Sequence, residues 1–467
     1  MRRTRRWCGC LVVALCMTSP LWAQDQAQDQ PKAPETSEPA SDAGATGGKP
    51  QLKWGLEAKM NYRHSEDNKF AVNFPFSPNQ LPVGQTKGFE ETVNAGSHIE
   101  LSDVSLFLDG VWSESLKAHL KVDFISLYER NPTSTGTQTN IDEAWVQFGR
   151  EAGHALLATS SGIYVRVGKM GKFERQNDRH LESYGVVSTA FNRIEDVGVE
   201  AGADLGQHFY VKGSYTAGNP VFMRDPNALA GDNGTPEEVQ PLLPNPDPKL
   251  KTGIVILYDA RVQDIDQKHP QTGLALGWRT ADTEGRNGID IMAWGRERKM
   301  AQGGTIQGSA YGTDIDLLNG PLNEFSFAIA NDRKREAGGN LWLYLGGFSF
   351  FAQYVDQDLA GLPRTGFEAE ASWTFDLPLV WSLGGQQLFS TIAPTVRYSM
   401  LDNKFKNPPI TPSPSFSWDW TKIDTGLRLG IVGATDLTVE YANNDFVLAS
   451  GAHRNNNEYL ATLRWRM

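Results

Sequence analysis

Hydrophobic and polar residues alternate with a period of two along most of the chain beyond residue 51. The segment 116–124, written LKAHLKVDF, places Leu, Ala, Leu, Val and Phe on one face of an extended strand, and Lys, His, Lys and Asp on the other. The same alternation recurs in 54–62, 197–205, 367–375, 423–431 and the closing residues YLATLRWRM. A period of two predicts β-strands whose two faces meet different surroundings.

The length of these segments and of their connections indicates a membrane barrel. The segments run about 9–11 residues, which is the length that a tilted strand needs to cross a bilayer. Short connections fall at 113–115, 206–207, 346–347 and 432–434, and long polar ones at 64–97, 171–193, 219–250 and 403–418. Short turns at one end and long loops at the other predict an all-β fold, a transmembrane antiparallel up-and-down β-barrel. We expect 16 strands, with 18 as the alternative.

Two points leave this prediction open. A soluble all-β protein also alternates, and it is the competing interpretation. The strand number depends on 285–339, where 289–296, 311–318 and 324–331 cannot all be spanning strands in up-and-down order, so one of them is predicted to be a loop.

Aromatic residues near strand ends are expected to form interfacial girdles: Trp54, Tyr62, Trp112, Tyr128, Trp418, Trp420 and Trp465.

The N-terminal residues predict export. Residues 1–23 join four arginines to a short apolar core and a small residue, which is typical of a secretory signal peptide. Residues 24–50 are rich in Pro, Gln, Asp and Gly and are predicted to be a disordered periplasmic linker, so that 51–467 forms the barrel. All three cysteines, Cys8, Cys10 and Cys16, lie in the signal, so the mature chain has no disulfide or thiolate metal site. The predicted location is the cell outer membrane of a Gram-negative bacterium.

The net charge of the chain indicates which partners are unfavourable for it. Removing the four arginines of the signal takes the formal net charge from −11 to −15, and an acidic chain disfavours nucleic acid as a partner. No His pair has metal-ligand spacing and no nucleophile–base motif is evident, so we expect no metal, no cofactor and no catalytic residues. A barrel enzyme is kept only as a remote alternative.

The candidate functional residues are basic. The face opposite the lipid carries charges of both signs, which suits a water-filled pore because an unpaired charge in a dry interior costs several kcal/mol. The third surface loop, 171–193, is rich in charge and is predicted to fold into the lumen as a constriction that sets selectivity. A solvated surface loop is the alternative. The predicted constriction residues are Lys117, Lys121, Arg166, Lys172, Arg175, Arg179 and Arg193. For each of them, pairing with a carboxylate to brace the wall is the competing role.

Several short motifs resemble the phosphate-selective porin family (porin O and porin P type). They are VRVGK at 165–169, RIEDVGV at 193–199, GGF at 346–348, VRYS at 396–399 and EY at 440–441. The resemblance implies a barrel of about 16 strands, often trimeric, that passes anions or small solutes. The chain departs from the family at 171–173, where GKF has no proline, and at Met467, where a terminal aromatic residue is usual. The family's basic ladder does not map onto this chain residue by residue.

The sequence therefore predicts an outer-membrane porin. Small hydrophilic solutes, with anions possibly preferred, would diffuse passively through a lumen narrowed by the third loop. A specialised barrel for export or uptake of an acidic polymer or organic acid is the alternative. The expected partners are outer-membrane lipid, lipopolysaccharide and small hydrophilic or anionic solutes, with a homotrimer as a possible assembly. The solute itself does not follow from the sequence.

Overall fold

A computed structural model describes residues 50–72, 88–91, 95–126, 139–151, 162–176, 179–192, 195–218, 268–281, 286–302, 329–378, 382–383, 386–404, 419–447 and 451–467. The predicted signal peptide and linker lie outside these residues, apart from Pro50. In the described part, alternating segments become long strands that form one closed antiparallel sheet. Because every main-chain group of a closed sheet has a neighbouring strand to bond with, the structure leaves no sheet edge open.

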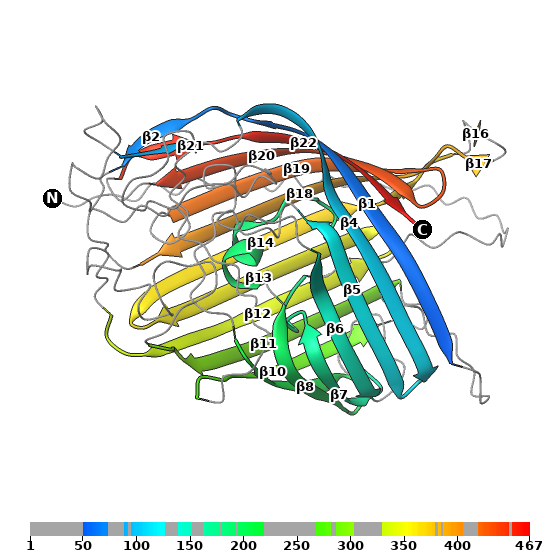
Figure 1. The fold of residues 1–467 in the computed structure, drawn as a ribbon, viewed down its shortest axis with the longest axis vertical. Helices are drawn as coiled ribbons and strands as arrows, with labels where there is room; N and C mark the ends of the chain where they lie inside the picture. The colour runs from blue at the N-terminus through cyan, green and yellow to red at the C-terminus, as the bar shows by residue number, and fades with distance from the viewer. Residues whose placement is uncertain are drawn as a thin grey trace, which may run out of the picture. The chain divides into compact units, whose positions relative to one another are not determined.

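Sixteen strands of the described residues make up the wall. They are β1 (Gln51–Ser65), β4 (Gly96–Ser113), β5 (Leu116–Ser126), β6 (Asn140–Gly149), β7 (Ile163–Met170), β8 (Asp196–Leu205), β9 (Phe209–Thr216), β10 (Gln271–Ala281), β11 (Asn287–Lys299), β12 (Arg333–Leu345), β13 (Phe348–Leu359), β14 (Leu362–Trp373), β18 (Phe389–Asn403), β19 (Asp419–Ile431), β20 (Thr435–Val447) and β22 (Glu458–Arg466). Each pairs with the next, and β22 pairs with β1, so the barrel closes (Figure 1). The predicted 16-stranded barrel is confirmed.

The remaining short strands are accessories to this wall. β15 (Phe375–Asp376) continues β14 along β18, and β21 (His453–Asn455) continues β22 along β20. β2 (Lys69–Val72) pairs with β3 (Gly88–Glu91), and β16 (Ser382–Leu383) pairs with β17 (Gln386–Gln387). We call the end of the barrel where β7 leads towards β8 the loop end, and the opposite end the turn end.

The uncertain region 285–339 contributes two wall strands. Segment 289–296 is a strand within β11, as predicted, and β11 pairs directly with β12 along its length. Segment 311–318 lies outside the described residues, and the described part of 324–331 is not a strand. The predicted alternation of short turns and long loops is not strict: β13 and β14 are joined at the loop end by only Ala360 and Gly361, both with positive φ. A two-residue turn of this kind matches the twist of the strands it joins.

The outer face of the barrel is apolar. Large hydrophobic side chains are exposed on strands all around it, which only a surrounding apolar phase makes favourable. Trp54, Tyr62, Trp112 and Trp465 are among these exposed side chains, in agreement with the predicted girdles. This is the architecture of an outer-membrane barrel, in agreement with the predicted location. The described residues contain no helix that is long and apolar enough to span a membrane.

Trp420 was expected in a girdle, and that expectation is wrong. Its side chain is buried, packs on Phe446 with ring centroids 5.1 Å apart, and donates to Asn444 Oδ1 at 3.2 Å. Trp420 shares its strand face with Lys422, which is also buried. Proximity to a strand end does not indicate which face of the strand a residue occupies, whereas the period of two does indicate it. Two other expected girdle residues, Tyr128 and Trp418, lie outside the described residues.

Candidate functional site

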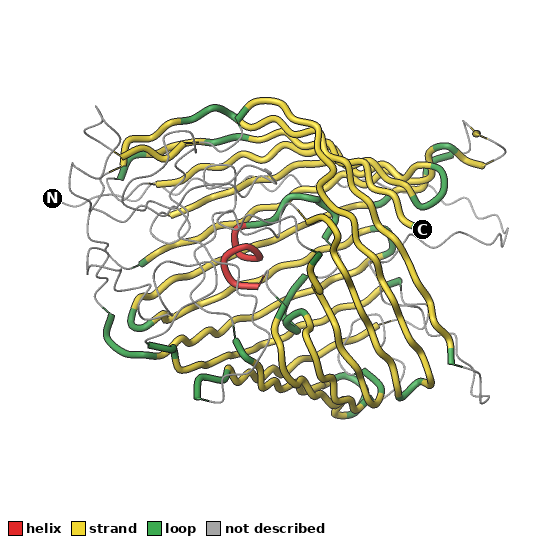
Figure 2. Tube along the Cα trace, in the orientation of Figure 1, coloured by secondary structure: helices red, strands yellow, loops and turns green. Residues whose placement is uncertain are grey.

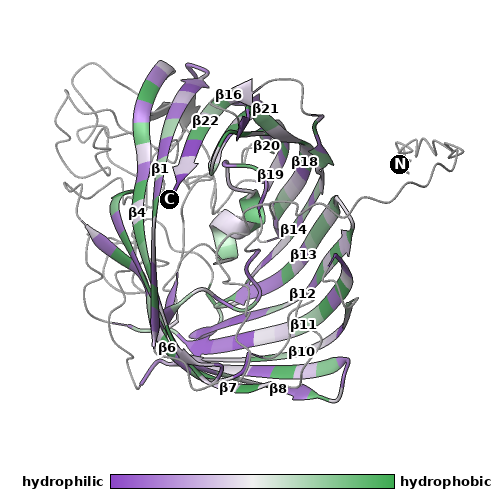
Figure 3. Ribbon diagram, turned by 90° about the vertical axis from the view of Figure 1, so that its right-hand side faces the viewer, coloured by the Kyte–Doolittle hydropathy of each residue, from purple (hydrophilic) through white to green (hydrophobic). Residues whose placement is uncertain are grey.

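The described part of the chain between β7 and β8 lies inside the barrel. Its described residues, 171–176 and 179–192, are called the inner loop here, and they end in the short helical turn η3 (Ser188–Asn192). Figures 2 and 3 show this turn enclosed by the strands in two views. Inner-loop groups bond to inward side chains of β18, which is the eighth strand from β7 in either direction around the barrel. The inner loop therefore crosses the lumen from one wall to the opposite wall.

Glu182 anchors the far part of the inner loop. Its carboxylate lies 3.3 Å from Lys59 Nζ on β1, 3.0 Å from Arg428 Nη2 on β19 and 3.3 Å from Arg464 Nη1 on β22. The main-chain N–H of Glu182 donates to Glu440 on β20. Burial by itself would raise the pKa of Glu182, but the three cations outweigh it and hold the pKa well below its usual range. One carboxylate thus ties the inner loop to three strands.

A second anchor is centred on Arg397 of β18. Its guanidinium is fully buried and donates to Asp424 Oδ2 at 2.8 Å and 3.0 Å. It also lies 3.4 Å from Glu370 Oε2 and donates to the main-chain oxygen of Ser183 at 2.9 Å. Glu370 in turn accepts from the main-chain N–H of His180 at 2.9 Å. Arg397 therefore joins three strands and the inner loop in one network of charge-assisted bonds.

The helical turn of the inner loop is held by Glu368 of β14. The carboxylate accepts the main-chain N–H groups of Val187 at 3.1 Å and Ser188 at 3.2 Å. These groups begin the turn and have no partner within it, so a wall carboxylate takes the place of a helix cap. Gly185 makes this approach possible, because a Cβ atom there would overlap the Glu368 carboxylate.

Gly185→Ala is expected to weaken the anchor at Glu368. The added methyl group must push the carboxylate away from Val187 and Ser188, so the inner loop should fluctuate more. We expect greater noise of the open-channel current in planar-bilayer recordings. Gly213→Ala is the matched control, because a Cβ there meets nothing closer than 3.7 Å. Equal noise in the two variants would contradict this role of Gly185.

The beginning of the inner loop, just after β7, is fixed by Glu174. Its carboxylate forms a two-bond pair with Arg296 of β11, at 2.8 Å and 2.7 Å. Its main-chain oxygen accepts from Asn340 of β12 at 2.6 Å and Gln353 of β13 at 3.1 Å. All four groups are buried. The inner loop is thus bonded at its beginning, its middle and its end.

Three of the seven predicted constriction residues, Lys121, Arg166 and Arg175, pair with carboxylates. On the wall, Lys121 Nζ lies 2.5 Å from Asp142 and 3.5 Å from Asp123. Arg166 lies 2.7 Å from Glu151 and stacks on Trp145, with its guanidinium carbon 4.4 Å from the ring centroid. Both contacts are of the kind that the competing, bracing interpretation expects.

The predicted constriction residues of the inner loop differ in the contacts that they make. Lys172 is buried and donates to the main-chain oxygen of Phe191 at 2.8 Å. Arg175 pairs with Glu195. Arg179 lies over the Tyr184 ring at 3.8 Å, and it forms no ion pair with any described residue. Lys117, on β5 near the turn end, likewise has no ion pair within the described part of the chain. Arg193 lies outside the described residues.

Three carboxylates that could together hold a metal ion lie beside Lys121 and Arg175. One oxygen each of Asp142, Glu143 and Glu195 lies within 4.8 Å of the others. Lys121 pairs with Asp142 and Arg175 with Glu195. These cations balance two of the three negative charges, so the geometry does not require a metal ion.

The sequence did not single out the carboxylates that anchor the loop. Glu182 was only one of several charges in 171–193, and Glu368 and Glu370 were only members of the inward face. One signal was available for Arg397: it lies directly opposite Asp424 once β18 and β19 are paired in register. Opposite charges at facing positions of neighbouring strands indicate an ion pair.

No protein-family model and no curated protein sequence matches the chain. Among solved structures, it is similar to the outer membrane channel DcaP of Acinetobacter baumannii, with 9% identity, a TM-score of 0.48, and coverage of 90% of this chain and 98% of that one. It is also similar to the anion-selective porin from Comamonas acidovorans, with 10% identity, a TM-score of 0.45, and coverage of 90% and 100%. OprB of Pseudomonas putida shows 9% identity, a TM-score of 0.45, and coverage of 89% and 94%. Similarities this weak carry no argument about function.

Proposed function

We propose that the chain is an outer-membrane porin through which small hydrophilic solutes diffuse passively. The observation that carries this proposal is the inner loop, which is bonded across a lumen lined by charged and polar side chains. Paired charges give the described part of the wall a polar lining, which suits the passage of hydrophilic solutes. The anchored face of the inner loop is turned to the wall from β11 to β22. The water path is therefore placed on its other side, along β4, β5 and β6.

The selectivity of this path depends on which charges are balanced. Lys121, Arg166 and Arg175 each stand beside a carboxylate, so they add little net positive potential. Arg179 and Lys117 have no such partner among the described residues and are the groups that would favour anions. We therefore propose a weak anion preference rather than a phosphate-specific site.

Single-channel recording of the purified protein in planar bilayers tests the function. A porin gives current that rises steadily with electrolyte concentration and is not blocked by one solute. Current that saturates, or that phosphate or an organic acid blocks at low concentration, would instead support the phosphate-selective family or a specialised barrel. Absence of any conductance from correctly folded protein would refute the proposal.

Arg179→Gln should shift the reversal potential in a salt gradient towards cation preference. Replacing a guanidinium that has no carboxylate partner removes a full positive charge from the path, with little effect on the fold. The matched control is Arg333→Gln, because Arg333 is an exposed arginine at the rim of β12. A reversal potential that stays the same in Arg179→Gln would show that this side chain does not face the path.

A further inference from the structure

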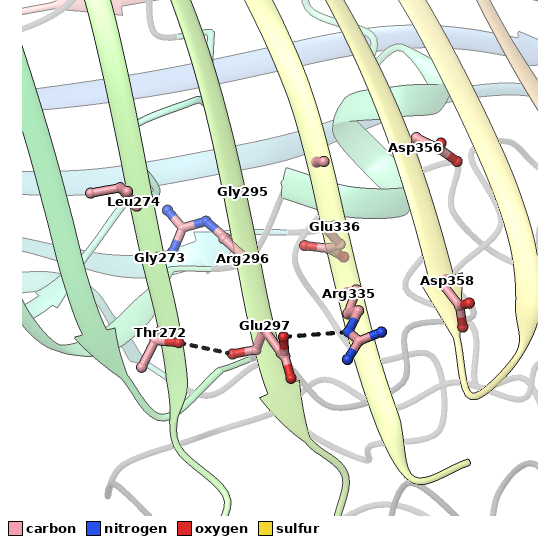
Figure 4. A pocket seen from close by; sticks show the side chains of 11 residues that line it. Thr272, Gly273, Leu274, Gly295, Arg296, Glu297, Arg335, Glu336, Asp356 and Asp358 are labelled. Atoms are coloured by element: carbon pink, nitrogen blue, oxygen red, sulfur yellow. Dashed lines mark hydrogen bonds and ion pairs between the residues drawn. The ribbon is translucent and has the colours of Figure 1, made fainter.

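The inward face of β13 places a serine against the inner loop. On the outward face, Asp356 and Asp358 line a shallow groove of about 540 Å³, which Figure 4 shows with the helical turn of the inner loop behind the sheet. Successive residues of a strand point to opposite faces, so the odd-numbered residues of β13 face the lumen. One of them, Gln353, donates to the main-chain oxygen of Glu174 in the inner loop, at 3.1 Å. Ser349 has the same parity and lies on the same face.

Ser349 contacts a histidine, and the histidine contacts a carboxylate. Ser349 Oγ lies 3.5 Å from Nε2 of His180 in the inner loop. Nδ1 of the same ring lies 3.3 Å from Glu370 Oε1 on β14. A hydroxyl, an imidazole and a carboxylate in this order form the constellation that activates a serine as a nucleophile. Before substrate binds, such hydrogen bonds are often long, and they shorten around the reacting group.

Glu370 fixes both the position and the protonation of the His180 ring. The oxygen that faces Nδ1 also accepts from the main-chain N–H of His180 at 2.9 Å and from Gln176 Nε2 at 3.2 Å. The other oxygen lies 3.4 Å from Arg397 Nη1, and a cation at this distance favours the ionised carboxylate. An ionised carboxylate can only accept, so the ring carries its proton on Nδ1. The lone pair of Nε2 is then turned to the hydroxyl of Ser349.

The site lies near the turn end of the lumen. Ser349 is the second residue of β13, directly after the turn at 346–347. The side chains of Ser349 and His180 are half-buried, whereas Glu370 is buried. A solute can therefore reach the serine and the imidazole, while the carboxylate that orients them is shielded. Tyr344 and Ser372 face Ser349 in the two neighbouring strands, and their hydroxyl groups are donors of the type that stabilises an oxyanion.

We propose that Ser349, His180 and Glu370 form a hydrolytic site for carboxylic esters of small hydrophilic alcohols that enter the lumen. Ser349 Oγ bonds to the acyl carbon while its proton moves to His180 Nε2. The ester C–O bond then breaks, and the alcohol leaves with that proton. Water attacks the acyl-enzyme and gives a proton to Nε2, which returns it to Ser349 Oγ as the carboxylic acid leaves. Glu370 acts as a positioning residue, and the activity goes beyond the proposed passage of solutes.

The surroundings of the site favour this substrate class. An alcohol leaves a tetrahedral intermediate more readily than an amine does, so a site whose oxyanion donors are side-chain hydroxyl groups suits esters better than amides. The lumen around it is lined by charged and polar side chains, which suits hydrophilic substrates. No sequence motif indicates the site, because its residues stand at positions 180, 349 and 370, on the inner loop and on two strands.

Covalent labelling of the purified barrel in detergent tests the proposal. An alkyl fluorophosphonate should form a stable adduct on Ser349, which peptide mass spectrometry locates. His180→Gln should be labelled about a hundredfold more slowly, because the general base that takes the serine proton is lost. A heat-shift assay on gels confirms that each variant is folded. Absence of an adduct, or adducts on other serines only, would overturn the proposal.

Turnover of p-nitrophenyl acetate measures the activity itself. Ser349→Ala should lower kcat/KM about a hundredfold. The matched control is Ser214→Ala, because Ser214 Oγ on β9 accepts from Arg296 at 3.1 Å and forms no hydrogen bond with a histidine of the described residues. This control should keep the wild-type rate. Equal rates in the wild type and Ser349→Ala would overturn the proposal.

Glu370→Gln tests the positioning role. It should lower kcat with little change in KM, because the ring stays near Ser349 but loses its fixed tautomer. An unchanged kcat would remove Glu370 from the site. The anchors of the inner loop described above do not include Ser349, so Ser349→Ala should have wild-type conductance. The hydrolytic site and the porin function can therefore fail independently of each other.

Discussion

Glu182→Gln is expected to detach the far part of the inner loop from the wall and to increase single-channel conductance. Glutamine keeps the size of the side chain but removes the charge that holds Lys59, Arg428 and Arg464 together. Removing one partner of a buried ionic group costs about 3–5 kcal/mol, which is enough to favour the detached state. Lys59, Arg428 and Arg464 would keep their other partners, Glu57, Asp103 and Asp436, but the lumen would lose one negative charge, so selectivity should shift towards anions.

Planar-bilayer conductance and reversal potential measure both effects at once. The matched control is Glu114→Gln, which removes a carboxylate from an ion pair with Arg150 in the short turn between β4 and β5. Glu182→Asp is the conservative variant and should recover part of the wild-type behaviour. Wild-type conductance in Glu182→Gln would show that the loop is held without this carboxylate.

The same anchor should resist mild acid. The pKa of Glu182 is held well below its usual range, so the anchor contributes its full stabilisation above the ordinary glutamate pKa. The contribution is lost only as the pH falls through the lowered pKa. Through the range in which free glutamates titrate, Glu182 should therefore stay ionised, and the conductance difference between the wild type and Glu182→Gln should persist.

The fold was predictable because each strand by itself shows the alternation that a membrane barrel requires. Each strand has lipid on one side and water or polar groups on the other, so alternation in 116–124 or 423–431 shows both the strand and its orientation. The strand number also followed, since an up-and-down barrel excludes one of the segments between 285 and 339. Trp420 shows the limit of the weaker signal, because nearness to a strand end does not determine which face a residue occupies.

The site was predictable only in part, because each charge finds its partner across the barrel. The charge content of 171–193 suggested a loop inside the lumen, and the described contacts agree with that. Residue type could not reveal that Glu182 meets side chains from β1, β19 and β22, which are separated by hundreds of positions in the chain. For the same reason the sequence could not identify Asp142 and Glu151 as the partners of Lys121 and Arg166.

Arg397→Gln is expected to be the most destabilising single change in the lumen. Arg397 is fully buried and lies between Asp424 and Glu370. Asp424 keeps Lys422 at 3.2 Å, so the loss of Arg397 leaves the buried carboxylate of Glu370 without its arginine. Such a change costs about 3–5 kcal/mol. The expected result is a lower temperature for conversion of the folded band on gels and a lower urea midpoint of tryptophan fluorescence.

A double variant separates lost charge balance from lost packing. If the cost arises from the uncompensated carboxylate, Arg397→Gln combined with Glu370→Gln should recover much of the stability, because Asp424 keeps Lys422 and the two neutral side chains can hydrogen-bond each other at facing positions of β14 and β18. Additive destabilisation by the two changes would instead mean that Arg397 acts mainly by filling space. Charge balance then could not explain why the inner loop is held at β18, and the anchor would have to be assigned to the bond from the main-chain N–H of Val186 to Ser399, which neither substitution removes.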